Sequence, residues 1–326
     1  MRESSHTLPR TAAENVEEFE GHWGWTLAQG SLAGENETVS PQQSASFLSR
    51  LDLTQVDRDI FTGLCHAGSP LRAYGGQIAA QSLMAAGATV EGDERQVHSL
   101  HGYFLRPGRS SDQITYLVER PRDGRSFSTR IVRAVQHGET IFMMTASFAL
   151  VEQGPMHQFA EPAAPLPDDV AAILLPRHVD LNEEETGWHS AESQGFELRI
   201  INPDTTMPLR DGRYEGMSWV RIPSELPHEP LIQASALTYL SDLTMVSTAL
   251  GPHGGKTSAH DLMLASIDHA VWFHAPINTN EWMLFAQDTP VARGGHGLAR
   301  GLFYDLNGIL VASVVQESLL RTRLPR

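Results

Sequence analysis

The chain has almost no cysteine, since Cys65 is the only one among its 326 residues. A single thiol excludes an intramolecular disulfide and any metal centre that needs several thiolates. The chain also lacks a Gly-x-Ser-x-Gly segment, which excludes the nucleophile elbow that many serine hydrolases use. We expect a protein that works without a metal and without a cofactor.

Basic residues are also scarce. The chain has 24 Lys and Arg against 39 Asp and Glu, which gives a formal net charge of −15. A protein that binds nucleic acid needs a basic surface to neutralise phosphates, and an acidic protein is repelled by anionic lipid. The composition therefore argues against nucleic acid and membrane surfaces as partners.

No apolar run is long enough to cross a bilayer. The longest, Phe142–Val151, is interrupted by Thr145 and Ser147. The opening residues MRESSHTLPR contain no apolar stretch of signal-peptide length, and the final RLPR matches no simple C-terminal address. These absences predict a cytoplasmic protein.

Several segments come close to binding motifs without matching them. LGPHGGKT has Leu250 where a phosphate-binding loop needs glycine, and GGHGLARG has Arg300 where the dinucleotide fingerprint needs its third glycine. His98 and His101 suggest a metal-binding pair, but residues three apart on a strand point to opposite faces. We therefore expect neither a nucleotide-binding loop nor a metal site at these positions.

The main positive feature is an internal repeat. Two segments of the first half recur in the second: 127–148 as 297–318, and 98–107 as 266–276. In the longer pair, Arg130 matches Arg300 and Gly138 matches Gly308, both 170 positions apart. A Pro-rich, acidic segment separates the halves and is typical of a linker. The predicted divisions are a flexible acidic extension at 1–45, a first domain at 46–153, a linker at 154–190 and a second domain at 191–326.

Each half contains a helix-like segment followed by alternating, β-branched or aromatic runs. The expected helices are residues 75–88, which are rich in alanine, residues 230–250, which begin at Pro230, and a short amphipathic helix over 47–61. The expected strands are 97–106, 113–120, 126–137, 140–151, 217–223, 262–274, 281–290, 296–305 and 308–320. A long helix followed by antiparallel strands, twice over, predicts an α+β protein whose two copies pack as a pseudo-dimer.

Three polar side chains stand where a purely structural protein would carry apolar ones. Ser266 and Gln316 fall on apolar faces of their predicted strands, and Asp242 lies within the predicted helix 230–250. Burying such a group without a partner costs about 1–3 kcal/mol. A local hydrogen bond or solvent explains each of them singly, whereas the three together, in a matching fold, indicate a functional site.

A family resemblance agrees with this interpretation. The runs YGGQIAAQSL, VHSLHGYFLRPG and RDGRSFSTRIVRAVQHGETIFMMTASF in the first half, with YLSDLTMVSTAL, LASIDHAVWFH, NEWMLF and GILVASVVQE in the second, resemble acyl-CoA thioesterase II, the TesB-like family. The resemblance spans roughly residues 46–322. It implies a double hotdog fold, in which two tandem units each wrap an antiparallel sheet around a long central helix. It also implies hydrolysis of fatty acyl-CoA to free fatty acid and coenzyme A.

The resemblance assigns the family's catalytic Asp, Thr or Ser, and Gln to Asp242, Ser266 and Gln316. In that role Asp242 is the base for a water that attacks the thioester directly, and Ser266 and Gln316 hold the water. Ser266 is not expected to be a nucleophile. His269, three residues along the same predicted strand, points to the opposite face unless the strand is bulged.

The substrate is acyl-CoA, and its contacts are predicted from individual residues. Gly75 and Gly76 are candidates for close approach of the ligand, with tight helix–sheet packing as the alternative reading. Arg106, Arg122 and Arg125 lie near predicted strand ends and are candidate cations for the phosphates of coenzyme A. We also expect a homo-oligomer.

Two other functions stay open at this point. A hotdog enoyl-CoA hydratase needs an Asp and a His that converge on water, and Asn202-Pro203-Asp204 lacks a following histidine. A non-catalytic acyl-CoA sensor has no use for a buried base, so the three polar residues argue against it.

Overall fold

The computed structural model describes residues 46–65, 72–92, 94–170, 195–201, 215–253 and 262–322. All of them belong to one compact unit, Gln43–Arg326. The predicted extension 1–45, part of the predicted linker and the segment Asn202-Pro203-Asp204 lie outside the described residues.

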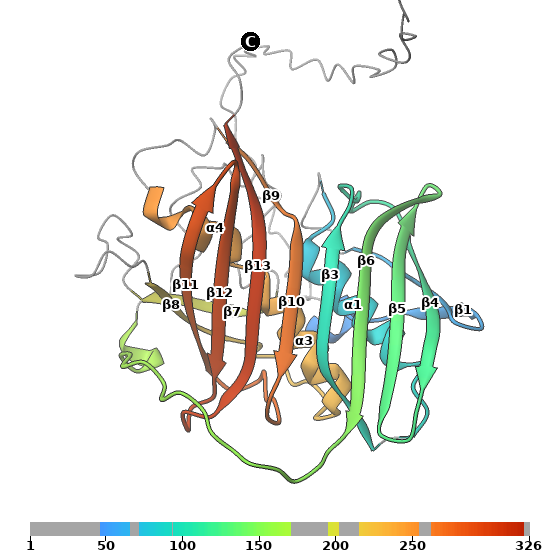
Figure 1. Cartoon of the computed structure of the whole chain (residues 1–326), viewed down its shortest axis with the longest axis horizontal. Helices are drawn as coiled ribbons and strands as arrows, with labels where there is room; N and C mark the ends of the chain where they lie inside the picture. The colour runs from blue at the N-terminus through green and yellow to red at the C-terminus, as the bar shows by residue number, and fades with distance from the viewer. Residues whose placement is uncertain are drawn as a thin grey trace, which may run out of the picture. The chain divides into compact units, whose positions relative to one another are not determined.

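The described strands form one antiparallel sheet of 13 strands (Figure 1). The first half supplies β1 (Thr54–Asp57), β2 (Ile60–Gly63), β3 (Arg95–Phe104), β4 (Ile114–Asp123), β5 (Phe127–Gln136) and β6 (Glu139–Leu150). The second half supplies β7 (Glu197–Ile201), β8 (Glu215–Arg221), β9 (Leu262–Ser266), β10 (Asp268–Phe273), β11 (Met283–Arg293), β12 (His296–Tyr304) and β13 (Leu310–Thr322). The order across the sheet is β1-β2-β4-β5-β6-β3-β10-β13-β12-β11-β8-β7, with β9 paired to β13.

The sheet order reflects the sequence repeat. Outward from the seam between β3 and β10, where Leu100 lies opposite Val271, the first half runs β3-β6-β5-β4 and the second runs β10-β13-β12-β11. Equivalent hairpin turns contain the matched glycines, since Gly138 has φ +79° and Gly308 has φ +75°. This left-handed backbone conformation is accessible to glycine at little cost, which explains the match at these turns.

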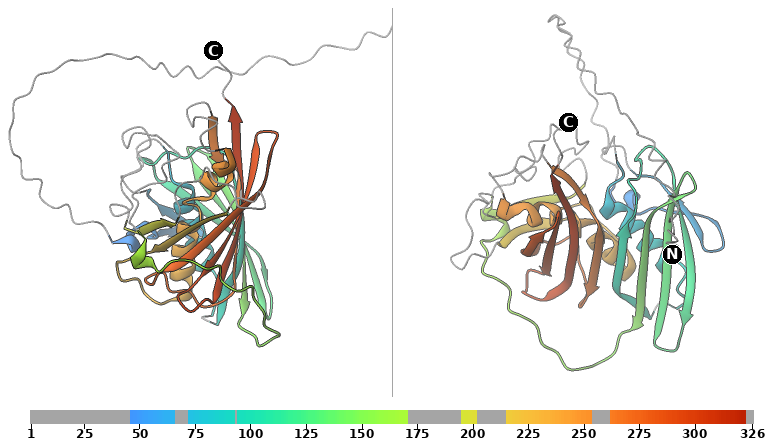
Figure 2. Two further views of the ribbon diagram at one scale, coloured as in Figure 1. Left: turned by 90° about the vertical axis from the view of Figure 1, so that its left-hand side faces the viewer. Right: turned by 45° about the horizontal axis from the view of Figure 1, so that its top comes forward.

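Three α-helices lie on one face of the described sheet (Figures 1 and 2). They are α1 (Gly75–Gly87), α3 (Pro230–Ser241) and α4 (Met245–Leu250), and short 3₁₀ turns are found at Phe47–Arg50, Pro167–Asp169 and Gly251–His253. The alanines of α1 are fully buried, and a Cβ on Gly87 would come within 2.4 Å of Leu231 on α3. Small side chains on α1 therefore allow both α3 and the sheet to pack closely against it. None of the described helices is long and apolar enough to span a membrane.

The amphipathic helix predicted over 47–61 was wrong. Only Phe47–Arg50 is helical, as a 3₁₀ turn, and the rest forms the β1–β2 hairpin. Asp59 takes φ +61° at the hairpin turn, a conformation that Asp tolerates better than most residues. The edge strand β7 was not predicted at all, because it has only five residues and no strong alternation.

The other predicted helices and strands are present, but two of them are interrupted. The helix expected over 230–250 ends at Ser241, and Asp242 follows as its C-cap, so the prediction that Asp242 lies within a helix was wrong. The strand expected over 262–274 breaks at Ile267 into β9 and β10. Ser266 pairs with Ser318 of β13 whereas Ala270 pairs with Val315, so one extra residue is accommodated between them. This is a β-bulge, and it reverses the in–out alternation that follows it.

The described part of the predicted linker runs along the second half of the sheet. Gln158 bonds to the backbone of Gly308 and Leu310 through its side-chain amide, and the Trp219 indole donates to the Pro165 carbonyl at 2.9 Å. Residues 151–166 contain no helix or strand, as their proline content predicts.

Candidate active site

The structure brings together the three polar side chains that the sequence singled out. Asp242 follows α3, Ser266 ends β9, and Gln316 lies in the middle of β13. The Ser266 hydroxyl donates to Asp242 Oδ1 at 3.2 Å, and Gln316 Nε2 donates to Ser266 Oγ at 3.0 Å. Asp242 directly follows the end of α3, and Ser266 precedes the bulge that separates β9 from β10. The two side chains meet where these elements end.

Burial raises the pKa of Asp242 to about 7. The side chain is only 8% exposed, and loss of hydration disfavours its charged form. Hydrogen bonds from Ser266, from the backbone N–H of Gly76 and from Gln316 oppose this effect because they stabilise the carboxylate. A carboxyl group with this pKa can both accept and return a proton near neutral pH.

The start of α1 packs directly against Asp242. A Cβ on Gly75 would lie 2.8 Å from Asp242 Oδ2, and one on Gly76 would lie 2.6 Å from the Tyr239 carbonyl oxygen. No larger residue fits at either position without displacement of these neighbours. The first turn of α1 also directs its partial positive charge at the carboxylate.

Two residues that the sequence analysis did not assign to the site, His269 and Ser241, extend this network. His269 is buried, with Nδ1 at 2.6 Å from Gln316 Oε1 and Nε2 at 2.7 Å from Ser241 Oγ. An unbulged strand would point His269 away from the Ser266 face, but the strand has the bulge that was the stated exception, and the bulge at Ile267 turns both side chains inward. His269 nevertheless contacts Gln316 rather than Ser266 in the described interactions.

The three candidate phosphate-binding arginines do not lie together. Arg106 follows β3, whose last residue Phe104 packs at the start of α1, and its guanidinium pairs with Glu139 at 3.0 Å. Arg122 and Arg125 are exposed at the β4–β5 hairpin, beside the other end of α1. The structure therefore brings only Arg106 to the end of α1 that Asp242 contacts.

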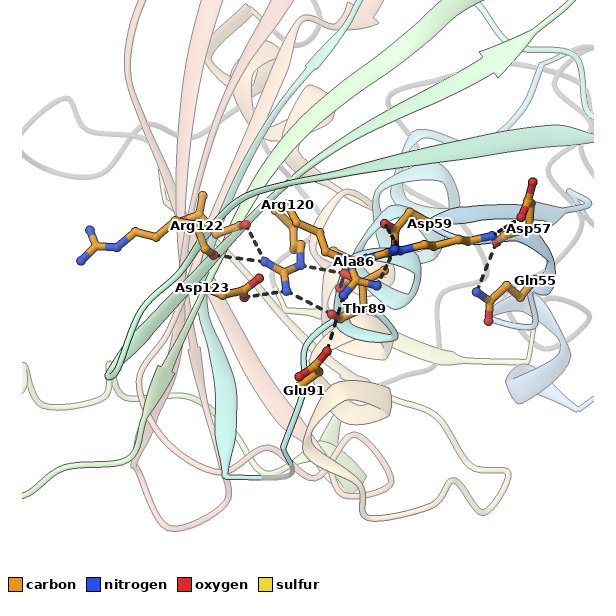
Figure 3. A network of polar contacts seen from close by, with 12 residues as sticks. Gln55, Asp57, Asp59, Ala86, Thr89, Glu91, Arg120, Arg122 and Asp123 are labelled. Carbon is orange, nitrogen blue, oxygen red and sulfur yellow. Dashed lines mark hydrogen bonds and ion pairs between the residues drawn. The ribbon is translucent and has the colours of Figure 1, made fainter.

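Figure 3 shows the environment of Arg122. Its carbonyl accepts a hydrogen bond from the fully buried Arg130, while its own guanidinium points away from the network. Arg130 also donates to the carbonyl of Thr89, just beyond α1, and pairs with Asp123 at 2.7 Å. Arg130 thus stabilises the carboxyl end of α1, where partial negative charge accumulates.

The histidine pair has separate structural contacts. His98 Nε2 lies 2.8 Å from Ser147 Oγ, and the His101 ring packs edge-on against Trp272 at 4.9 Å between ring centres. Within the described ranges, no cluster of three or more His, Cys, Asp or Glu side chains has the arrangement of a metal site.

Comparisons with known proteins show the family to which the chain belongs. The profile of the acyl-CoA thioesterase family matches residues 198–319, and that of the acyl-CoA thioesterase N-terminal domain matches residues 66–149. Acyl-coenzyme A thioesterase 8 of Mus musculus is 34% identical over 90% of this chain and 93% of its own length. Acyl-CoA thioesterase 2 of Haemophilus influenzae is 37% identical over 83% of this chain and 95% of its own length.

Solved structures give the same result. The acyl-CoA thioesterase II TesB2 of Mycobacterium marinum is 39% identical, with a TM-score of 0.73 over 85% of this chain and 99% of that one. A protein of unknown function with a hotdog fold from Alicyclobacillus acidocaldarius is 20% identical, with a TM-score of 0.68 over 85% of this chain and 98% of that one, a likeness of fold alone. With relatives above 30% identity along most of its length, the chain belongs to the acyl-CoA thioesterase family and has a hotdog fold.

Proposed function

We propose that this protein hydrolyses fatty acyl-CoA to free fatty acid and coenzyme A by direct attack of a water molecule that Asp242 activates. The supporting observation is the contact of Asp242 with Ser266, and of Ser266 with Gln316, around a carboxyl group whose pKa burial raises to about 7. A base with this pKa is well matched to proton transfer at neutral pH.

The proposed reaction has two stages. The Asp242 carboxylate takes a proton from water while the water oxygen bonds to the thioester carbon, and the carbonyl electron pair moves to oxygen. The tetrahedral intermediate then collapses, the carbon–sulfur bond breaks, and Asp242 returns the proton to the departing thiolate. Backbone N–H groups at the start of α1, with the helix dipole behind them, are the proposed stabilisers of the oxyanion.

Ser266 and Gln316 are proposed to position the water. When Asp242 is ionised it only accepts hydrogen bonds, so the Ser266 hydroxyl points at Asp242 and its lone pairs stay available to other donors. A water molecule that is already positioned loses little further entropy when it reaches the transition state. This positioning is proposed to contribute part of the rate enhancement.

The finer architecture is also a proposal. We infer a double hotdog with domains at 46–153 and 191–326, supported by the equivalent strand orders on the two sides of the β3–β10 seam. Arg106 is the proposed cation beside the reacting end of α1. Arg122 and Arg125 stay candidates for the distant phosphates of coenzyme A, since α1, at about 1.5 Å per residue over 13 residues, separates the two regions by roughly 20 Å. A homo-oligomer and a cytoplasmic location also stay predictions.

One assay tests the function. The protein is incubated with palmitoyl-CoA and a reagent that reports free thiol, and the acyl product is identified by mass spectrometry. Release of free thiol with palmitate supports the proposal. With an enoyl-CoA substrate, hydration without free thiol would indicate a hydratase instead, and binding without any product would indicate an acyl-CoA sensor.

A further inference from the structure

His269 and Ser241 form a buried extension behind the proposed catalytic residues. The exposed fraction is 1% for His269 and 0% for both Ser241 and Gln316. His269 lies between the other two, 2.6 Å from Gln316 Oε1 and 2.7 Å from Ser241 Oγ. Nothing in the proposed reaction requires this imidazole to contact the substrate, so its role must be sought in what it does to Gln316.

The direction of every hydrogen bond follows from Asp242. An ionised Asp242 only accepts, so Ser266 uses its single hydrogen there and must accept at its oxygen. Gln316 therefore presents its NH₂ group to Ser266 and its carbonyl oxygen to His269.

The same reasoning fixes the state of His269. Because Gln316 Oε1 accepts, Nδ1 of His269 carries a hydrogen. Burial lowers the pKa of His269 to about 4, so the ring is neutral and its Nε2 is an acceptor. The Ser241 hydroxyl lies 2.9 Å from the Thr238 carbonyl oxygen and 2.7 Å from Nε2 of His269. In this pattern its single hydrogen is directed at Nε2, because two lone pairs facing each other at 2.7 Å would repel.

The alternative orientation of Gln316 conflicts with this pattern. A flipped amide would place NH₂ against the Nδ1 hydrogen of His269, and the carbonyl oxygen would face the Ser266 oxygen, whose hydrogen is already directed at Asp242. An amide side chain without His269 could rotate between its two orientations, since its oxygen and nitrogen are nearly equal in shape. The Nδ1 hydrogen of His269 therefore adds a second constraint on the orientation of the Gln316 amide, beside the one that Ser266 sets.

We propose that His269 is a positioning residue for the hydrolysis, which fixes the amide of Gln316 so that its NH₂ group faces Ser266 and the attacking water. Ser241 in turn holds the His269 ring through its contact with Nε2. This inference rests on the proposed function and deepens it, because it assigns a role to two residues that do not touch the reacting atoms.

Two variants of His269 separate orientation from simple packing. In His269→Asn the amide nitrogen takes the place of Nδ1 and still donates to Gln316, whereas in His269→Gln the amide reaches the place of Nε2 and that donor is lost. We expect His269→Gln to lower kcat about 10- to 100-fold with KM within about twofold, since misplaced catalytic groups cost rates of this order. We expect His269→Asn to retain kcat within about fivefold of wild type.

The matched control is His274→Gln. His274 bonds to Ser313 Oγ at 2.8 Å, also through Nε2, but on an exposed position directly after β10. Its substitution should leave kcat and KM unchanged. If His269→Gln does not fold, Ser241→Ala gives an independent test, with an expected fall in kcat of about three- to tenfold.

A double variant tests whether His269 acts through Gln316. In a Gln316→Ala background, His269→Gln should reduce kcat by less than a further twofold. Three outcomes would each overturn the proposal. The first is an equal loss of kcat in His269→Asn and His269→Gln, and the second is a wild-type kcat in His269→Gln or in Ser241→Ala. The third is full additivity of the two substitutions in the double variant. An active Asp242→Asn enzyme would instead overturn the proposed function, so the two failures are distinguishable.

Discussion

The hydroxyl of Ser266 donates to Oδ1 of Asp242 at 3.2 Å, from a strand end to the residue that terminates a helix. The donor stabilises the carboxylate, while burial of the pair opposes ionisation more strongly and raises the pKa of Asp242 to about 7. The carboxyl group thus accepts hydrogen bonds, yet its pKa lies close to that of an ordinary histidine.

Replacing Asp242 by Asn should nearly abolish turnover while leaving acyl-CoA binding largely intact. The change is close to isosteric but removes the base, and general-base assistance contributes about 10²–10⁴ in rate. The measurement is kcat by thiol release, together with the Kd of a non-hydrolysable acyl-CoA analogue. Asp288→Asn, which alters a carboxylate paired with Arg300, serves as the control, and a loss of less than threefold in Asp242→Asn would contradict the assignment.

The pH dependence should follow the ionisation of Asp242. Only the carboxylate accepts a proton from water, so kcat/KM should fall about tenfold per pH unit below about pH 7 and level off above it. His269 should add no inflection in this range, because burial lowers its pKa to about 4. Following the thioester absorbance directly between pH 5 and 9 avoids the pH dependence of thiol reagents. A flat profile would exclude Asp242 as the base.

Gln316→Ala should lower kcat more than it raises KM. The amide is proposed to orient water rather than to bind the acyl or nucleotide part of the substrate. Gln233→Ala is the matched control, because Gln233 is also a buried glutamine but bonds to Pro227 and Thr279 at the start of α3. Steady-state kinetics on both variants give kcat and KM. A rise in KM with an unchanged kcat would show that Gln316 binds substrate and does not orient water.

Ser266 should not become acylated. Its hydrogen is directed at Asp242, and the nearby His269 contacts Gln316 instead, so no imidazole is placed to take the proton. Rapid mixing with acyl-CoA should show no stoichiometric burst of coenzyme A. Ser266→Thr should retain substantial activity because it keeps the hydroxyl. An acyl group trapped on Ser266 and detected by mass spectrometry would refute direct attack by water.

The repeat-related arginines should differ in their effect on stability. Arg130→Met removes a buried guanidinium that bonds to Thr89 and Asp123, and should destabilise the protein by about 2–3 kcal/mol. Arg300→Met removes a half-exposed ion pair with Asp288 and should cost less than about 1 kcal/mol. Urea unfolding of both variants makes the comparison, and equal losses would show that the burial of Arg130 does not matter.

The sequence predicted most of the strands because their alternation is local. Residues 126–137 and 296–305, for example, correspond to β5 and β12 within a few residues. The hairpin at β1–β2 was missed because the apolar residues from Phe47 to Phe61 also fit a helical spacing. Tertiary pairing of β2 with β4 decides between the two readings, and it involves residues more than fifty positions away.

The residue types of the site were predictable, but its geometry was not. Asp242, Ser266 and Gln316 were conspicuous as polar groups in apolar surroundings. His269 was not conspicuous, because its inward direction depends on the one-residue bulge at Ile267. That bulge arises because β13 pairs first with β10 and then, in a shifted register, with β9. A period-two pattern carries no information about where such a bulge falls.

The contact between the N–H of Gly76 and the carboxylate of Asp242 joins the first half of the chain to the second. The repeat is not symmetric in this respect, because Ala146 occupies the position that matches Gln316. One half contributes the start of α1 and the other contributes the proposed catalytic residues, so in the proposed mechanism neither copy contains a complete reaction centre. Under the proposed mechanism, therefore, neither half of the chain can hydrolyse a thioester without the other.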